Sequence, residues 1–138
     1  MTGHNEAIGG GGFHHISMRV SDLEASLKFY TEGLGFAHRM EWVSGGRRMI
    51  LLDTGDGNYL ELMAGESDGF NPNGLIGHFA FRTDDCDKAI EAARAAGAEV
   101  TVEPKDVVLA SDPPVPIRVA FFKGPDGELI EFFQDDVT

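Results

Sequence analysis

Apolar and polar residues alternate along several short segments of the chain, which is the pattern of strands with one buried face. The predicted strands of the first half are 15–20, 36–42, 47–53 and 59–63. Those of the second half are 78–83, 99–103 and a hairpin within 117–133. After the first strand of each half, the apolar spacing changes to that of an amphipathic helix. The pattern therefore predicts the order β-α-β-β-β twice.

Both predicted helices have recognisable ends. Ser21, with Glu24 three residues later, forms a capping-box sequence that begins a helix running to about Thr31. The second helix runs from about Cys86 to Ala96, and Gly97 is its expected stop.

The two halves also repeat each other in sequence. MILLDTGDGNYLELM (residues 49–63) aligns without a gap on VAFFKGPDGELIEFF (residues 119–133), so that Glu61 falls on Glu131. More loosely, HISMRVSDLEASLKFY from His15 matches HFAFRTDDCDKAIEAA from His78. A repeat of this length indicates two supersecondary units that bury their apolar faces together. We therefore predict an α+β fold, in which two paired βαβββ modules form a concave mixed sheet.

The same features divide the chain into segments. Residues 1–12 end in four glycines and are expected to form a disordered leader. The first module is predicted over 13–64, a linker over 65–76 and the second module over 77–135. The proline-bearing stretch 104–116 has no counterpart of its length in the first module, so we expect a loop there that forms a rim or lid.

Strand alternation separates an apolar face, expected to pack on the helices, from a second, concave face. The repeated polar residues left on the concave face are His15, Glu61, His78 and Glu131. Taken singly, a strand-end His is more often structural than a ligand, and a strand Glu usually faces water. All four repeat together on one side, however, and buried carboxylates need compensating charge, which favours a shared divalent-metal site. Candidates to line a substrate pocket on this face are Arg19, Tyr59, Met63 and Phe133.

Composition and charge narrow the classes of partner. The chain has 138 residues, enough for one domain with its own core. Its formal net charge of −12 argues against binding to nucleic acid or to an anionic membrane surface, and a small-molecule substrate is the remaining expectation. No segment reaches the roughly 18 consecutive apolar residues of a membrane span. Because Cys86 is the single cysteine, no intramolecular disulfide forms, which is typical of a reducing compartment and predicts a cytoplasmic location.

Three segments carry a resemblance to a known family. They are FHHISMRVSDLEASLKFYTEGLGF, GHFAFRTDD and GPDGELIEFF, all within residues 13–134. With these motifs the chain resembles the vicinal oxygen chelate superfamily, which contains glyoxalases, bleomycin-resistance proteins and extradiol dioxygenases. Within the superfamily it is most similar to bacterial glyoxalase I, the lactoylglutathione lyases.

The resemblance implies a metal-dependent lyase or isomerase. The implied ligands of one divalent ion per site (Ni²⁺, Zn²⁺, Co²⁺ or Mn²⁺) are His15, Glu61, His78 and Glu131. Such an ion would chelate neighbouring oxygens of an α-oxo, hemithioacetal-like substrate and stabilise its enediolate. Glu131 would be the principal base and Glu61 its counterpart. The resemblance further implies a homodimer and glutathione as cosubstrate, with Arg19 binding a glutathione carboxylate; an ion pair at the cleft rim is the alternative role for Arg19.

The family pattern is incomplete around the glutathione pocket. Glyoxalase I has an Asn shortly after its first ligand Glu, where this chain reads Met63-Ala64-Gly65-Glu66, and VVLASDPPVPIR replaces a Lys-Gly loop. Three other functions therefore stay open. An acyl-CoA epimerase usually has Gln at the position of Glu61, and a metal-free small-molecule binding or resistance protein generally lacks the four ligands. An extradiol dioxygenase needs Fe²⁺ held by only two His and one carboxylate.

Overall fold

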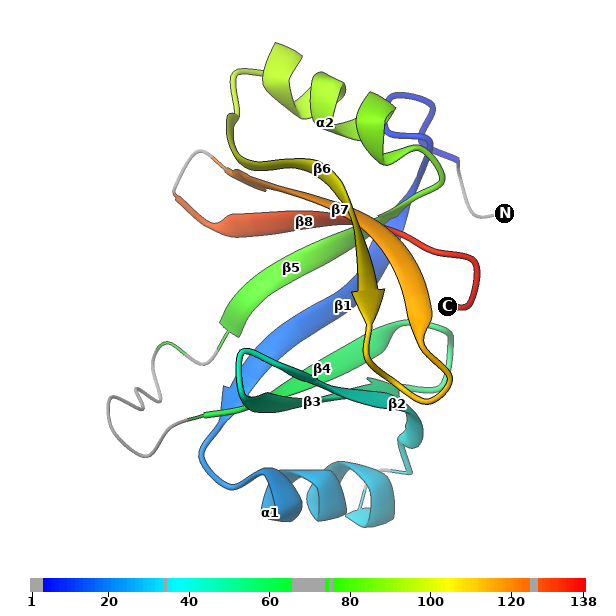
Figure 1. Cartoon of the computed structure of the whole chain (residues 1–138), viewed down its shortest axis with the longest axis vertical. Coiled ribbons are helices and arrows are strands. Elements are labelled where there is room, and N and C mark those ends of the chain that lie inside the picture. The colour runs from blue at the N-terminus through cyan, green and yellow to red at the C-terminus, as the bar shows by residue number, and fades with distance from the viewer. Residues whose placement is uncertain (1–3, 34, 66–73, 75, 125–126) are drawn as a thin grey trace.

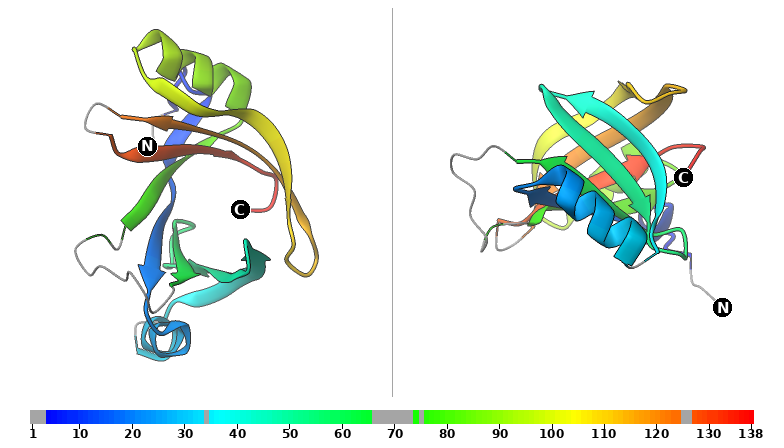
Figure 2. Two further views of the ribbon diagram at one scale, coloured as in Figure 1. Left: turned by 60° about the vertical axis from the view of Figure 1, so that its left-hand side comes forward. Right: turned by 90° about the horizontal axis from the view of Figure 1, so that it is seen from below.

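The computed structural model describes residues 4–33, 35–65, 74, 76–124 and 127–138. An eight-stranded mixed sheet curls around a concave face, and one helix lies outside each end of it (Figure 1; Figure 2). The strands are β1 (Gly10–Val20), β2 (Ala37–Ser44), β3 (Arg47–Asp53), β4 (Tyr59–Ala64), β5 (Ile76–Thr83), β6 (Glu99–Leu109), β7 (Val115–Lys123) and β8 (Leu129–Gln134). The helices are α1 (Leu23–Lys28), continued by the π-helix η1 (Phe29–Gly33), and α2 (Cys86–Ala95).

The strand order β2-β3-β4-β1-β5-β8-β7-β6 shows the duplication directly. In each module the first strand pairs in parallel with the last, β1 with β4 and β5 with β8. The antiparallel pair β1–β5 joins the modules at the centre of the sheet. The predicted α+β fold of paired βαβββ modules is confirmed. Its four central strands are those that carry the two repeated His and the two repeated Glu.

Two apolar clusters hold the helices against the outer face of the sheet. Under α1, Val20, Ile50 and Leu62 are buried, and under α2 the corresponding cluster contains Ile90 and Phe132. These are the faces that alternation predicted would pack on the helices. A third cluster covers the concave side and contains residues of both modules, including Trp42, Met49, Leu51, Leu109, Ile117, Val119 and Phe133.

The helix α1 begins one residue later than the capping-box sequence predicts. Asp22 is the N-cap, and its carboxylate accepts a hydrogen bond from the Ala25 N–H at 3.1 Å. Asp is as good a cap as Ser, and the carboxylate also lies favourably at the positive end of the helix. The helix then changes to π geometry over Phe29–Gly33.

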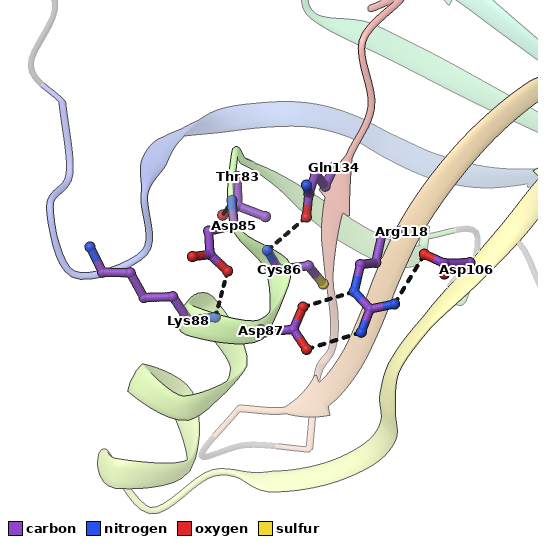
Figure 3. Close-up of polar contacts among 8 residues, drawn as sticks. All are labelled: Thr83, Asp85, Cys86, Asp87, Lys88, Asp106, Arg118 and Gln134. Atoms are coloured by element: carbon purple, nitrogen blue, oxygen red, sulfur yellow. Dashed lines mark hydrogen bonds and ion pairs between the residues drawn. The ribbon is translucent and has the colours of Figure 1, made fainter.

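The helix α2 starts and ends close to the predicted positions and is anchored to the sheet at its first turn (Figure 3). Asp85 caps the helix by accepting from the Lys88 N–H at 3.0 Å. The Cys86 N–H donates to the side-chain oxygen of Gln134 on β8 at 2.8 Å, and Arg118 on β7 donates to both carboxylate oxygens of Asp87. These contacts tie the helix to β7 and to β8, the strand that carries Glu131.

The predicted loop over residues 104–116 is wrong for most of its length. β6 continues to Leu109 and β7 starts at Val115, so a long hairpin replaces the loop, with the cis Asp112–Pro113 bond in its turn. Pro104 is tolerated because β6 is the edge strand of the sheet, where the backbone N–H that proline lacks is not needed for pairing on the open side. Pro116 fits because β7 pairs with β8 only from Arg118 onward. In Figure 2 the hairpin arches over the concave side of the sheet.

The predicted leader is also wrong at its end, because Gly10–Gly12 belong to β1. Asn5 and Gly10 exchange two backbone hydrogen bonds, and Ile8, which lies between them in the sequence, packs on the cluster under α2. At Gly10 an added Cβ would lie 3.4 Å from the Arg82 carbonyl oxygen, and φ is +144°, so glycine permits this close approach. The sequence pattern signals flexibility here, whereas the glycines serve strand pairing. Most of the predicted 65–76 linker lies outside the described residues.

Candidate metal centre

The four repeated polar residues come together on the concave face, from four adjacent strands of one chain. The order of these strands, β4-β1-β5-β8, places the two His between the two Glu. His15 is 2% exposed, and Glu61 and Glu131 are each 5% exposed. The strand pair β1–β5, which joins the two modules, supplies both imidazoles. All four side chains come from one chain.

The side-chain atoms of the cluster lie within a few ångströms of one another. His15 Nε2 and His78 Nε2 are 2.9 Å apart. Glu131 Oε2 lies 3.2 Å from His15 Nε2 and 2.9 Å from His78 Nε2. One ligand atom from each of these three residues lies within 4.8 Å of the others. Glu61 is more distant, with oxygens 3.7 Å from His15 Nε2 and 4.0 Å from His78 Nε2.

The electrostatics of the cluster follow from its burial and its pairing. Burial would raise the pKa of Glu131, but hydrogen bonds from His15 and His78 outweigh it and lower that pKa to about 2. Burial would lower the pKa of His15, but Glu61 and Glu131 together raise it. In this arrangement a proton on His15 compensates the buried carboxylates, which is the role that a bound cation would also serve.

A third histidine, His14, contacts the Nδ1 atom of His15, while the Nε2 atom of His15 faces the cluster. It is fully buried and its ring stacks on Phe133 with centroids 4.0 Å apart. Its Nδ1 lies 2.8 Å from His15 Nδ1, and its Nε2 contacts the hydroxyl of Thr138. Burial first, and then the charges of His15 and Arg82, lower the pKa of His14 to about 2, so its imidazole is neutral.

The direction of this hydrogen-bond chain can be assigned from its far end. An ionised carboxylate only accepts, so the Thr138 hydroxyl donates to Asp135, 2.8 Å away. Thr138 Oγ1 then accepts from His14 Nε2–H, which leaves His14 Nδ1 without a proton. That nitrogen accepts from His15 Nδ1–H, so a neutral His15 carries its lone pair on Nε2, facing His78 and Glu131. The chain fixes the tautomer that a metal ligand requires.

The sequence pattern did not single out His14, and this role was missed. Regular alternation turns neighbouring residues to opposite faces, but the β1–β5 pairing shifts register between Phe13 and His15. This bulge lets both His be buried. The sequence repeat gave no signal for the role of His14, because the corresponding residue of the second module, just before His78, is Gly77.

Ser17 is a further residue of the cluster that the sequence did not single out. It lies in register with Glu61 on β4 and with His78 on β5, and it is fully buried. Within the described part of the chain, its hydroxyl has no hydrogen-bond partner. A buried hydroxyl without a partner costs free energy, so one beside two ionisable groups indicates a place where a ligand or water oxygen binds.

A cavity of about 290 Å³ opens onto the cluster, and Glu61, His78 and Glu131 are among its lining residues. The predicted pocket residues Met63 and Phe133 also line it. Tyr59 does not; it is buried in the concave-side cluster, with its ring 5.1 Å from that of His14. Arg19 is exposed and lies outside the lining residues. The hairpin β6–β7 supplies much of the wall, where a loop forming a rim or lid was predicted.

Comparison with known proteins agrees with this architecture. Residues 12–132 match the family model of the Glyoxalase/Bleomycin resistance protein/Dioxygenase superfamily. A probable lactoylglutathione lyase of Vibrio cholerae is 32% identical over 128 residues, covering 88% of this chain and 88% of that protein. The lactoylglutathione lyase of Haemophilus influenzae is 32% identical over 143 residues, covering 90% and 93%.

Solved structures give a second set of similar proteins. The crystal structure of methylmalonyl-CoA epimerase from Mycobacterium tuberculosis has a TM-score of 0.76 at 23% identity, covering 96% of this chain and 92% of that one. A variant of the Streptomyces coelicolor methylmalonyl-CoA epimerase in complex with 2-nitronate-propionyl-CoA has a TM-score of 0.67 at 27% identity, covering 89% and 96%. The chain therefore belongs to the Glyoxalase/Bleomycin resistance protein/Dioxygenase superfamily.

Proposed function

We propose that this protein is a metal-dependent lyase or isomerase of the glyoxalase I type. It would move a proton from the carbon next to the carbonyl group of an α-oxo, hemithioacetal-like substrate to the carbonyl carbon. The observation that carries the proposal is the convergence of His15, His78 and Glu131, with Glu61 close by, at the floor of a cavity. The similar lactoylglutathione lyases support the reaction class.

The donor set fits a divalent metal ion. Two imidazole nitrogens and two carboxylates are ligands that Ni²⁺, Zn²⁺, Co²⁺ and Mn²⁺ accept in proteins. The residues are buried, and the ion pairs of both carboxylates among the described residues are with His15 and His78. The hydrogen-bond chain behind His15 leaves its Nε2 free to bind. When bound, such an ion supplies positive charge that makes a carbon-bound proton next to a carbonyl more acidic.

The protein's own residues would then carry the proton. Glu61 on β4 and Glu131 on β8 lie on opposite sides of the imidazole pair, so a substrate held between them presents each face to one carboxylate. We assign Glu131 as the principal base and Glu61 as its counterpart, as the resemblance to glyoxalase I implies. The apolar hairpin wall would exclude water from the site, which strengthens the effect of nearby charges. The unpartnered Ser17 hydroxyl is placed to donate to a substrate or water oxygen.

An epimerase is the second candidate, supported by the similarity to the Streptomyces coelicolor methylmalonyl-CoA epimerase described above. It would use the same proton chemistry at one carbon, with the two carboxylates acting on opposite faces. A homodimer remains our prediction, and the four cluster residues come together within one chain.

The proposal can be tested with a substrate screen. Metal-reconstituted protein is assayed with the methylglyoxal–glutathione hemithioacetal and with methylmalonyl-CoA, beside Glu131→Gln and Glu61→Gln. We expect turnover of at least one of them by the parent protein and its loss in Glu131→Gln, with the circular dichroism spectrum retained. Turnover of neither by the metal-loaded parent protein would contradict the proposal, as would unchanged turnover in Glu131→Gln.

A further inference from the structure

The wall of the cavity is apolar and comes from both modules. Trp42, Met49 and Met63 line it from the first module, and residues of the hairpin β6–β7 line it from the second. Trp42 and Met49 are nearly fully buried. Charged and hydrogen-bonding groups therefore gather at the floor, around Glu61, His78 and Glu131, whereas the walls offer mainly apolar contact. A ligand whose body is polar would lose hydration here without replacing its hydrogen bonds.

One basic side chain interrupts this wall. Lys105 lines the cavity, and it is the one Lys or Arg to do so among the described residues. On β6 it pairs with Val119 of β7, which in turn pairs with Phe133 of β8. At roughly 4.8 Å between neighbouring strands, Lys105 is about 10 Å from β8 along the sheet. The backbone of Lys105 is therefore two strands away from β8, the strand that carries Glu131, on the hairpin wall of the cavity.

Lys105 has no acidic partner within the described part of the chain. By contrast, Arg48, Arg94, Arg118 and Lys123 each form a salt bridge on the surface of this strongly acidic protein. An exposed lysine can solvate its own charge, so the absence of a partner costs little. It does leave the ammonium free to pair with an anion of a ligand in the cavity.

The cavity also limits the size of what it encloses. Its volume is about 290 Å³. Small-molecule sites commonly measure about 300–1,000 Å³, so this cavity is at the small end of that range. A tripeptide conjugate such as a glutathione adduct would therefore extend out of the opening.

We infer that the enclosed part of the substrate is a compact molecule with three features: vicinal oxygens at the floor, a branched or aromatic apolar body against the wall, and an anionic group at the far end that pairs with Lys105. This inference rests on the proposed function for the first feature only. The apolar wall and Lys105 carry the other two.

Three probes separate these features. Hydroxyacetone has only the vicinal oxygens, hydroxymethyl phenyl ketone adds the apolar ring, and the para-carboxylate of that ketone adds the distal anion. Binding is followed by fluorescence, because Trp42 is the single tryptophan and lines the cavity, and by calorimetry as an optical control. Exchange of the carbon-bound protons in deuterated water, followed by nuclear magnetic resonance, gives a separate readout of proton transfer.

We expect affinity to rise on the order of tenfold or more from hydroxyacetone to the phenyl ketone, because the ring leaves water. The para-carboxylate should increase the affinity by a further factor of about two to five, as expected for a partly exposed ion pair with Lys105. Lys105→Gln should remove that second gain and leave the affinity of the neutral ketone unchanged. Lys88→Gln, an exposed lysine on α2, is the matched control and should change neither.

The outcomes distinguish this inference from the proposed function. Equal affinity for hydroxyacetone and the phenyl ketone would overturn the apolar-body assignment. An equal effect of the carboxylate in the parent and in Lys105→Gln would overturn the role of Lys105. If the affinity order holds but no proton exchange or turnover occurs in the metal-loaded protein, the substrate class stands and the proposed reaction falls. Turnover of the hemithioacetal without this affinity order would instead support the reaction and overturn the substrate class.

Discussion

Glu131 lies closer to the two imidazoles than Glu61 does, so we expect Glu131→Gln to lower the stability of the metal-free protein more than Glu61→Gln does. Glu131 accepts hydrogen bonds from both imidazoles, at 3.2 and 2.9 Å. The oxygens of Glu61 are 3.7 and 4.0 Å from the same nitrogens, beyond hydrogen-bond length. Glu131→Gln removes a charged acceptor of two hydrogen bonds, whereas Glu61→Gln removes a charge at longer range.

The size of the difference follows from the pKa of Glu131, which is lowered from 4.5 to about 2. At about 1.4 kcal/mol for each pKa unit, the ionised form is stabilised in the folded protein by about 3 kcal/mol. Because Gln keeps a neutral acceptor in the same place, we expect Glu131→Gln to lower the free energy of unfolding by roughly 1–3 kcal/mol. Glu61→Gln should lower it by less than about 1 kcal/mol.

Urea unfolding of EDTA-treated protein at pH 7, followed by Trp42 fluorescence, measures both variants. With a slope of roughly 1–3 kcal/mol per molar urea, the Glu131→Gln midpoint should fall by about 1 M. A lowered carboxyl pKa stabilises above the ordinary pKa, so the gap between the parent and Glu131→Gln should be full above pH 4.5 and shrink as the pH falls toward 2. A larger effect of Glu61→Gln, or a gap that does not change with pH, would refute the reasoning.

Three other substitutions probe the surroundings of the site. Ser17→Ala removes a buried hydroxyl that has no partner among the described residues, so we expect the free energy of unfolding to rise by up to about 1 kcal/mol while turnover falls. A lower free energy of unfolding would mean that the hydroxyl has a partner in the metal-free protein. His14→Phe keeps the stack on Phe133 but removes the acceptor of His15, so calorimetry should show about 10–100-fold weaker metal binding, and unchanged affinity would contradict the assigned hydrogen-bond chain. Burial raises the pKa of Cys86 from 9.0 to about 12, so the folded protein keeps a proton that the unfolded chain loses. Unfolding free energy should therefore fall by about 1.4 kcal/mol for each pH unit above 9, and Cys86→Ala should lack this slope; the same slope in both would assign it to other groups.

The sequence predicted the centre of the site more completely than its surroundings. The repeat identified His15, Glu61, His78 and Glu131, and strand alternation put them on one face, because both signals depend only on register within regular strands. His14 could not be predicted in the same way, since its burial depends on a register shift between two strands. Ser17 was on the predicted face, but its missing partner is visible only when neighbouring side chains are in place.

The other differences arise where a local signal competes with tertiary structure. Prolines at 104 and 116 favoured a loop, but edge and end positions in the sheet tolerate proline, so β6 and β7 extend through them. The four glycines favoured a flexible leader, yet Gly10–Gly12 belong to β1, and Gly10 permits a close approach to the end of β5. The first of these corrections bears on the site, because the extended hairpin supplies much of the cavity wall, including Lys105.

Calorimetric titration of Ni²⁺ or Zn²⁺ into metal-free protein tests most directly whether the four converging side chains form a metal centre. We predict about one ion bound per chain, with affinity reduced at least tenfold by His78→Ala and by Glu131→Gln. The exposed His38→Ala should bind as tightly as the parent protein and serves as the control. An absence of binding, or binding that survives both cluster substitutions unchanged, would contradict the assignment.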